Sequence, residues 1–201
     1  MGDRQVFQPL TREDRITVVL YRIGIVLSAV LVAGLAFLVW AASPGFDTAG
    51  GTATADILLY GLQAAVGMCV FFIHLYVAKF KRFLKNLYFI SLGFLAVLLA
   101  VGEGSLSGAL VQAPASALLL LPLSGCLGFV TAKEAFCFQL FEGYLLAMIM
   151  PFFLVLAASG VLDGPRASSG MTLISAMLVF FTLRKAFMPL AYDIGDKSAY
   201  H

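Results

Sequence analysis

Six long apolar runs dominate this sequence and limit what the chain can fold into. A helix needs roughly 20 predominantly apolar residues to cross a hydrocarbon layer about 30 Å thick, because each residue advances it by about 1.5 Å. The runs that come close to this length cover residues 16–42, 55–78, 86–101, 112–130, 143–161 and 168–187. Each run is bounded by Gly, Pro or charged residues. The sequence therefore predicts an all-α, polytopic membrane bundle of six transmembrane helices.

The composition agrees with this fold class. Hydrophobic residues make up 61% of the 201 residues and charged residues only 12%, and the mean hydropathy is +0.98. A charged share of about 25% is usual in soluble domains. The runs leave only a polar N-terminal arm at 1–15 and a polar tail at 188–201 outside a bundle at 16–187, so no soluble catalytic domain is expected. The net charge of +2 gives no reason to expect a nucleic acid, and membrane lipid is the expected partner.

The positive charges predict how the bundle is oriented. If the chain crosses the membrane six times, 12 of the 13 Lys and Arg residues fall on one side and only Arg166 falls on the other. The other side carries acidic residues, among them Asp56, Glu103 and Asp163. Because cytoplasmic loops hold the excess of Lys and Arg, both termini are predicted to be cytoplasmic or stromal (N-in/C-in).

A polar stripe on the second run is the first candidate site. His74 lies near the basic end of this run, with Gln63 and Gly67 on its face at helical spacing. A neutral imidazole could ligate the metal of a chlorophyll or haem or hydrogen-bond a quinone, and Gly67 would leave room for a flat ring. His74 and Gln63 are thus the candidate cofactor contacts, with chlorophyll, carotenoid or lipid as candidate ligands. The alternative, which is commoner for a single histidine near a helix end, is a bond to a backbone carbonyl or headgroup.

Residues 131–142 combine aromatic and charged side chains and form the second candidate site. We expect this segment to lie in the membrane interface or to dip into the bundle with the carboxylates of Glu134 and Glu142 facing protein. Lys133 should point away from Glu134 on a helix. The expected cationic partners are Arg22, Lys85 and Arg184. A structural ion pair, a proton-relay carboxylate and a docking element are the three interpretations of Glu134.

The end of the sixth run and the tail form the third candidate site. Arg184 and Lys185 fit a last helical turn, where cations complement the helix dipole and meet anionic headgroups. Asp193 and Asp196 flank Gly195 and favour a tight turn or a partner-docking patch over a metal site. The residues predicted to form docking contacts or ion pairs are Arg22, Lys81, Arg82, Lys133, Glu134, Glu142, Arg184, Lys185, Asp193 and Asp196.

Several motifs on the basic side resemble one protein family. They are Tyr21-Arg22, Ile73-His74-Leu75-Tyr76 followed by Lys81-Arg82-Phe83-Leu84, the segment from Lys133 to Phe138, and Arg184-Lys185 followed by Asp193-Ile194-Gly195-Asp196-Lys197-Ser198. They are similar to the integral membrane proteins of domain of unknown function 2301, a family found mainly in cyanobacteria and other phototrophs. The resemblance implies a multi-helix membrane protein with no assigned activity. Residues 190–192 depart from it, because more proline is expected there.

These observations favour a non-catalytic accessory subunit or assembly factor. It would dock through its cytoplasmic or stromal face on a larger membrane complex, a photosystem in the phototroph setting, in the thylakoid or cytoplasmic membrane. No catalytic or metal-binding motif is found, and Cys69, Cys126 and Cys137 are too widely spaced to suggest zinc. One alternative is a small proton- or ion-coupled transporter or channel with Glu134, His74 and Arg22 as its relay. Another is a membrane enzyme acting on lipid, quinone or pigment.

Overall fold

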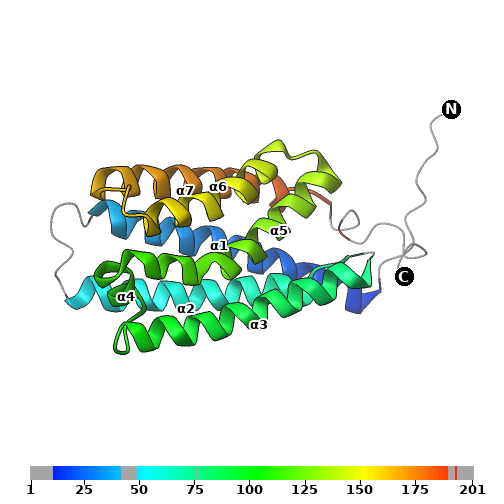
Figure 1. Cartoon of the computed structure of the whole chain (residues 1–201). Helices are drawn as coiled ribbons and strands as arrows, with labels where there is room; N and C mark the ends of the chain where they lie inside the picture. Colours follow the sequence, from blue (N-terminus) through cyan, green and yellow to red (C-terminus); the bar gives the residue numbers. More distant parts are fainter. Residues whose placement is uncertain (1–10, 42–48, 76, 190–192, 194–201) are drawn as a thin grey trace.

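The computed structural model describes residues 11–41, 49–75, 77–189 and 193, and the described residues contain helices and no β-strand. The elements are α1 (Arg12–Ala41), α2 (Ala49–Phe72), α3 (Ala78–Val101), α4 (Leu106–Gln112), the 3-10 helix η1 (Pro114–Leu120), α5 (Leu121–Phe138), α6 (Phe141–Ala158) and α7 (Gly164–Ala186). Figure 1 shows them as one elongated bundle.

The six predicted membrane spans are confirmed by length and apolar composition. They are α1, residues 51–72 of α2, α3, the continuous stretch of η1 and α5, α6, and α7. Pro122 lies in the first turn of α5, where its missing N–H is tolerated, and the change from 3-10 to α-helix occurs at this point. The short helix α4 was not predicted. Which side of the membrane each end faces stays a prediction.

Two predicted boundaries are wrong, and both errors lie where charged residues continue a helix. The predicted third run covers 86–101, but α3 begins at Ala78 and contains the basic residues before Asn86 in its first two turns. The predicted fourth run covers 112–130, but α5 continues to Phe138, so most of the segment 131–142 is helical. Gln139 then adopts a left-handed conformation with φ 54°, which ends the helix and allows α6 to begin at Phe141.

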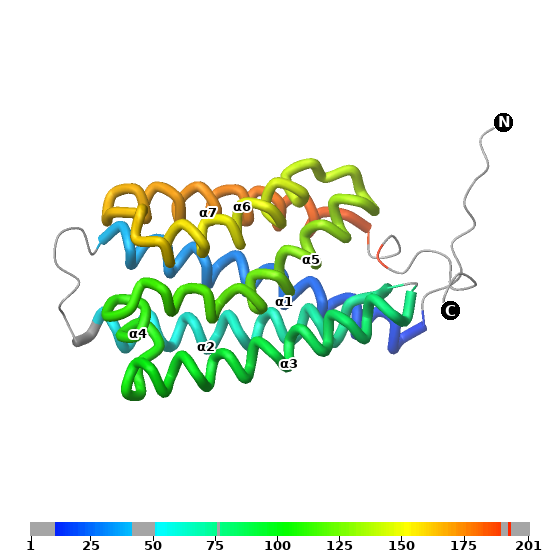
Figure 2. Tube along the Cα trace, viewed as in Figure 1, coloured from blue at the N-terminus to red at the C-terminus, as the bar shows by residue number. Residues whose placement is uncertain are grey.

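Helix α1 is the centre of the packing and lies between α2 and α7 (Figures 1 and 2). Small residues permit this close approach. A Cβ atom on Gly24 of α1 would lie 2.8 Å from the sulfur of Cys69 and 2.9 Å from the carbonyl oxygen of Ala65, both on α2. Gly128 of α5 packs against Ala147 of α6 in the same way. As expected for membrane helices, close contact is made by small residues rather than by bulky ones.

The two ends of the bundle differ in charge. One end, which we call the basic end, contains the start of α1, the α2–α3 and α5–α6 connections and the end of α7 (right in Figure 1). The other, which we call the opposite end, contains α4, the α3–α4 turn and the α6–α7 turn. Every described Lys and Arg except Arg166 lies in the half of its helix that is nearer the basic end, as the sequence predicts.

Candidate functional site

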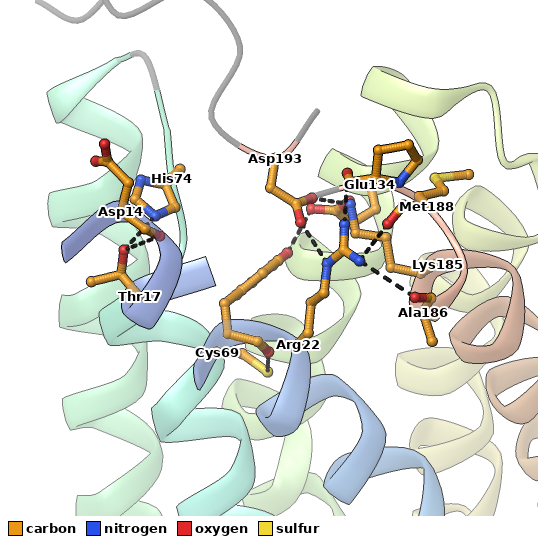
Figure 3. Close-up of polar contacts among 12 residues, drawn as sticks. Asp14, Thr17, Arg22, Cys69, His74, Glu134, Lys185, Ala186, Met188 and Asp193 are labelled. Carbon is orange, nitrogen blue, oxygen red and sulfur yellow. Dashed lines mark hydrogen bonds and ion pairs between the residues drawn. The ribbon is translucent and has the colours of Figure 1, made fainter. Parts of the chain in front are cut away.

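Four charged side chains from three helices and the C-terminal segment meet at the basic end and form a buried ion network. Lys185 of α7 is 1% exposed and forms ion pairs with both Glu134 of α5 and Asp193. The second oxygen of Asp193 accepts a 2.7 Å bond from Nε of Arg22 on α1. Figure 3 shows these four side chains pointing toward one another. Since isolated buried charges are strongly disfavoured, the members of this network depend on each other.

Arg22 also binds the backbone at the end of α7. Its Nη1 donates to the carbonyl oxygens of Met188 at 2.5 Å and Ala186 at 3.4 Å, and its Nη2 donates to that of Pro189 at 3.0 Å. These carbonyls follow or end a helix and have no intrahelical donors of their own. The planar guanidinium therefore joins α1 to the last turn of α7 and to the segment beyond it.

Two further groups complete the surroundings of Glu134. Nζ of Lys133 lies 2.7 Å from Oε1 of Glu134, and the phenol of Tyr21 donates a 2.7 Å hydrogen bond to the same oxygen. Nζ of Lys133 also lies 5.5 Å from the centre of the Tyr21 ring. Glu134 is fully buried, so its predicted orientation toward protein is confirmed.

The predicted partners of Glu134 are wrong, however. Lys133 does not point away, because its long side chain bends back to the neighbouring carboxylate. Arg22 binds Asp193 instead, and Arg184 binds Glu142 at 2.7 Å. Lys185 was expected to meet headgroups, but it turns inward because α7 presents it to α5.

Three of the remaining predicted docking residues do not contact the network. Lys81 is partly buried and Arg82 exposed on the first turns of α3. Arg184 is 45% exposed at its side chain. Asp196 lies outside the described residues.

His74 lies apart from the network, in the connection between α2 and α3 (Figure 3). Its Nε2 is 3.1 Å from the hydroxyl oxygen of Thr17 on α1. Burial lowers the pKa of His74 below its ordinary value, and the positive charges of Lys81 and Lys133 lower it further. The neutral imidazole is thus the favoured form at neutral pH.

The predicted polar stripe of His74 and Gln63 is not formed. Helix α2 ends at Phe72, before His74. Nε2 of Gln63 donates a 2.7 Å bond to Ser91 on α3, and the space beside Gly67 is filled by the Tyr88 ring. No flat ligand fits beside Gly67 in this packing, and whether either residue contacts a cofactor stays a prediction.

A cavity of about 450 Å³, which we call the apolar chamber, occupies the half of the bundle toward the opposite end. Its walls come from α1, α2, α4, η1, α5, α6 and α7, or the connections beside them, and are apolar except for Ser107 and Ser124. It extends from the exposed Val111 to the fully buried Val66 near mid-bundle. The residue patterns of the sequence did not predict it.

The two serines of the apolar chamber differ in their hydrogen bonding. Ser107 donates its N–H to Asp56 at 2.7 Å and its hydroxyl to the carbonyl oxygen of Thr52 at 3.1 Å. The Ser124 hydroxyl is buried and has no hydrogen-bond partner among the described residues. A buried hydroxyl without a hydrogen-bond partner is uncommon, so a bound molecule that offers a hydrogen bond would satisfy it.

No group of three or more His, Cys, Asp or Glu side chains in the described part of the chain is arranged to hold a metal ion. The free thiols of Cys69 and Cys126 are buried, whereas Cys137 is exposed.

Comparisons with known proteins agree with the membrane fold. No solved structure matches the chain. An uncharacterised protein of Haemophilus influenzae is 27% identical over 202 residues, which cover 100% of this chain and 99% of the relative. A phototroph distribution is not shown by either match and stays a prediction. The profile of a family described as uncharacterised integral membrane protein (DUF2301) matches residues 68–201, and since this is more than half of the chain, the protein belongs to that family.

Proposed function

We propose that this protein binds an apolar or amphipathic molecule of the bilayer in the apolar chamber. The chamber carries the proposal, because about 450 Å³ lies within the usual range of ligand sites, roughly 300–1,000 Å³. Its apolar walls offer water few hydrogen-bond partners. A hydrocarbon chain restores the dispersion contacts that these walls otherwise lack.

The ligand class follows from the two ends of the chamber. The surface near Val111 belongs to the opposite end of the bundle, and the deep part near Val66 is closed by the packed core. The Ser107 N–H and hydroxyl are bonded to Asp56 and Thr52, so among the described wall residues Ser124 supplies the hydroxyl that a ligand can bind. This arrangement suits a molecule that is mostly hydrocarbon and has a polar group within reach of Ser124, as many lipids and isoprenoids have. No chemical step is part of the proposal.

Filling the apolar chamber with a larger side chain tests the proposal. Ala117 is 6% exposed and lines the chamber, whereas the neighbouring Leu118 is 41% exposed and does not. We expect Ala117→Phe to reduce the amount of co-purified lipid-class molecule about tenfold, which corresponds to a loss of about 1.4 kcal/mol. The matched control Leu118→Phe should leave it unchanged. Extraction from protein purified in mild detergent, followed by mass spectrometry, measures this amount, and equal amounts in both variants would contradict the proposal.

An accessory role is a second candidate, favoured by exposed aromatic residues at the basic end. Phe136, Phe141 and Phe187 are 80%, 68% and 87% exposed and lie at or beside helix ends. Side chains of this kind are enriched where proteins meet. We therefore retain docking on a larger membrane complex as a proposal. A photosystem is the partner suggested by the family resemblance alone.

Purification in mild detergent tests the accessory role. A stable partner that is lost in a Phe136→Ser, Phe141→Ser variant would support it. A protein that migrates alone after chemical cross-linking in its native membrane would contradict it.

A further inference from the structure

Asp193 occupies a position that has the features of an oxyanion site. Its two carboxylate oxygens bind different cations, Arg22 of α1 and Lys185 of α7. Both the Lys185 and the Asp193 side chains are 1% exposed, so this contact is almost fully removed from water. Guanidinium and ammonium groups are the side-chain cations with which proteins bind carboxylate and phosphate oxygens.

The two cations are held in place by groups other than Asp193. Lys185 also pairs with Glu134, and its Nζ lies 3.8 Å from the centre of the Phe138 ring. Arg22 is fixed by the carbonyl oxygens of Met188 and Pro189. Each cation therefore has partners other than the carboxylate of Asp193.

The charges of the network require an anion at this position. With Asp193 in place, three cations, Arg22, Lys133 and Lys185, face two carboxylates. Without it, the same three cations face Glu134 alone. Leaving buried cations without a counter-charge is strongly unfavourable, so any group that displaces Asp193 must bring negative charge with it.

The site can be reached from the basic end. The Arg22 and Lys133 side chains keep 12% and 11% exposure, and the bonds of Arg22 to the carbonyls of Ala186 and Pro189 are exposed. Asp193 is bound through the chain itself, and a group held by a short connection competes as if present at millimolar concentration. A diffusible oxyanion at similar concentration can therefore compete with it.

We propose that Arg22 and Lys185 form a binding site for a phosphate-class oxyanion, which Asp193 occupies in this structure. The oxyanion is either free phosphate or the phosphate of an anionic lipid headgroup, since both present the same oxygens to the same cations. The site is separate from the apolar chamber, which lies in the other half of the bundle.

Thermal unfolding of the full chain in detergent tests this site with inorganic phosphate as the probe. Phosphate should raise the melting temperature of Asp193→Asn by several degrees relative to chloride at equal ionic strength. The wild type should gain less, because its own carboxylate competes. Arg22→Gln combined with Asp193→Asn should gain nothing. Asp163→Asn, a change of the same kind at the opposite end, should behave like the wild type.

Two further arms complete the test. Nanodiscs of phosphatidylglycerol, compared with phosphatidylcholine, should stabilise Asp193→Asn without free phosphate if the source is a lipid. If Asp193→Asn does not fold, hydrogen exchange of wild-type peptides from 188–201 should rise with phosphate and not with chloride. An Asp193→Asn protein that neither phosphate nor phosphatidylglycerol stabilises beyond the double variant overturns the proposal, as does unchanged exchange in the wild type.

Discussion

The phenol of Tyr21 donates a 2.7 Å hydrogen bond to the carboxylate of Glu134, and this bond joins α1 to α5 in the buried part of the basic end. Tyr21 is 1% exposed and Glu134 is fully buried. The two residues are 113 positions apart in the chain, so their contact exists only when the bundle is assembled. The bond fixes α1, which carries Arg22, relative to α5, which carries Glu134.

Removing this hydroxyl should lower stability without dismantling the network. Tyr21→Phe leaves Lys133 and Lys185 on Glu134, so the expected loss is that of one hydrogen bond to a charged group, about 1.5–3 kcal/mol. Tyr60 is 44% exposed, and Tyr60→Phe should change the free energy of unfolding by less than about 0.5 kcal/mol. Equilibrium unfolding in mixed detergent micelles measures both. Equal losses in the two variants would contradict a specific role for this bond.

Substitution of the neighbouring cations Arg184 and Lys185 on α7 should change the free energy of unfolding by very different amounts. Lys185→Gln leaves the buried Glu134 and Asp193 without their shared cation, and the expected loss is about 3–5 kcal/mol. Arg184 is 45% exposed and its pair with Glu142 is screened by water, so Arg184→Gln should cost less than about 1 kcal/mol. The same unfolding measurement separates them, and a large loss in Arg184→Gln would place the important cation one residue earlier.

Much of the fold follows from the sequence, because apolar run length and charge distribution are local properties. They predicted six spans and the grouping of cations at one end. The helix ends were harder to place where charged residues continue a helix, as Lys79 and Lys81 do at the start of α3 and Lys133 and Glu134 do near the end of α5. Local polarity suggested that the membrane helices end before these residues. In α5, the ion pairs of Glu134 with Lys133 and Lys185 make the charged residues compatible with a buried helix. In α3, the basic residues lie in the first two turns, at the end of the helix.

The sequence predicted that Glu134 is buried, but it did not predict which cations pair with it, and the reason is physical. A carboxylate such as Glu134 in an apolar context must be buried and paired, and that was expected. Its partners depend on how α1, α5 and α7 are rotated against each other, which no pattern in one helix records. The apolar chamber was missed because it arises from the shape of η1 and α4 beside five long helices, and its wall residues resemble ordinary membrane leucines and alanines.

Close packing of α1 on α2 should depend on Gly24. A methyl group there would lie 2.9 Å from the carbonyl oxygen of Ala65, a backbone atom that cannot move aside, so Gly24→Ala should separate the helices and lower the melting temperature. Gly93 in α3 has nothing within 4 Å of the corresponding position. Gly93→Ala should therefore raise stability by about 0.5–1 kcal/mol through helix propensity. Thermal unfolding of the pair in one detergent gives the comparison, and a gain in both variants would exclude tight packing at Gly24.

The pH dependence of stability should report on His74. Burial and the charges of Lys81 and Lys133 lower its pKa in the folded protein, so the unfolded chain binds more protons in the range between the lowered pKa and about 6.5. Stability should then fall as the pH drops from about 6.5 toward the folded pKa and stay level, for this group, below it. His74→Gln should remove this part of the pH dependence, whereas His201→Gln should keep it. Melting temperatures between pH 5 and 8 measure the effect. A slope that is unchanged in His74→Gln would assign it to another group and leave the contact with Thr17 as a packing feature alone.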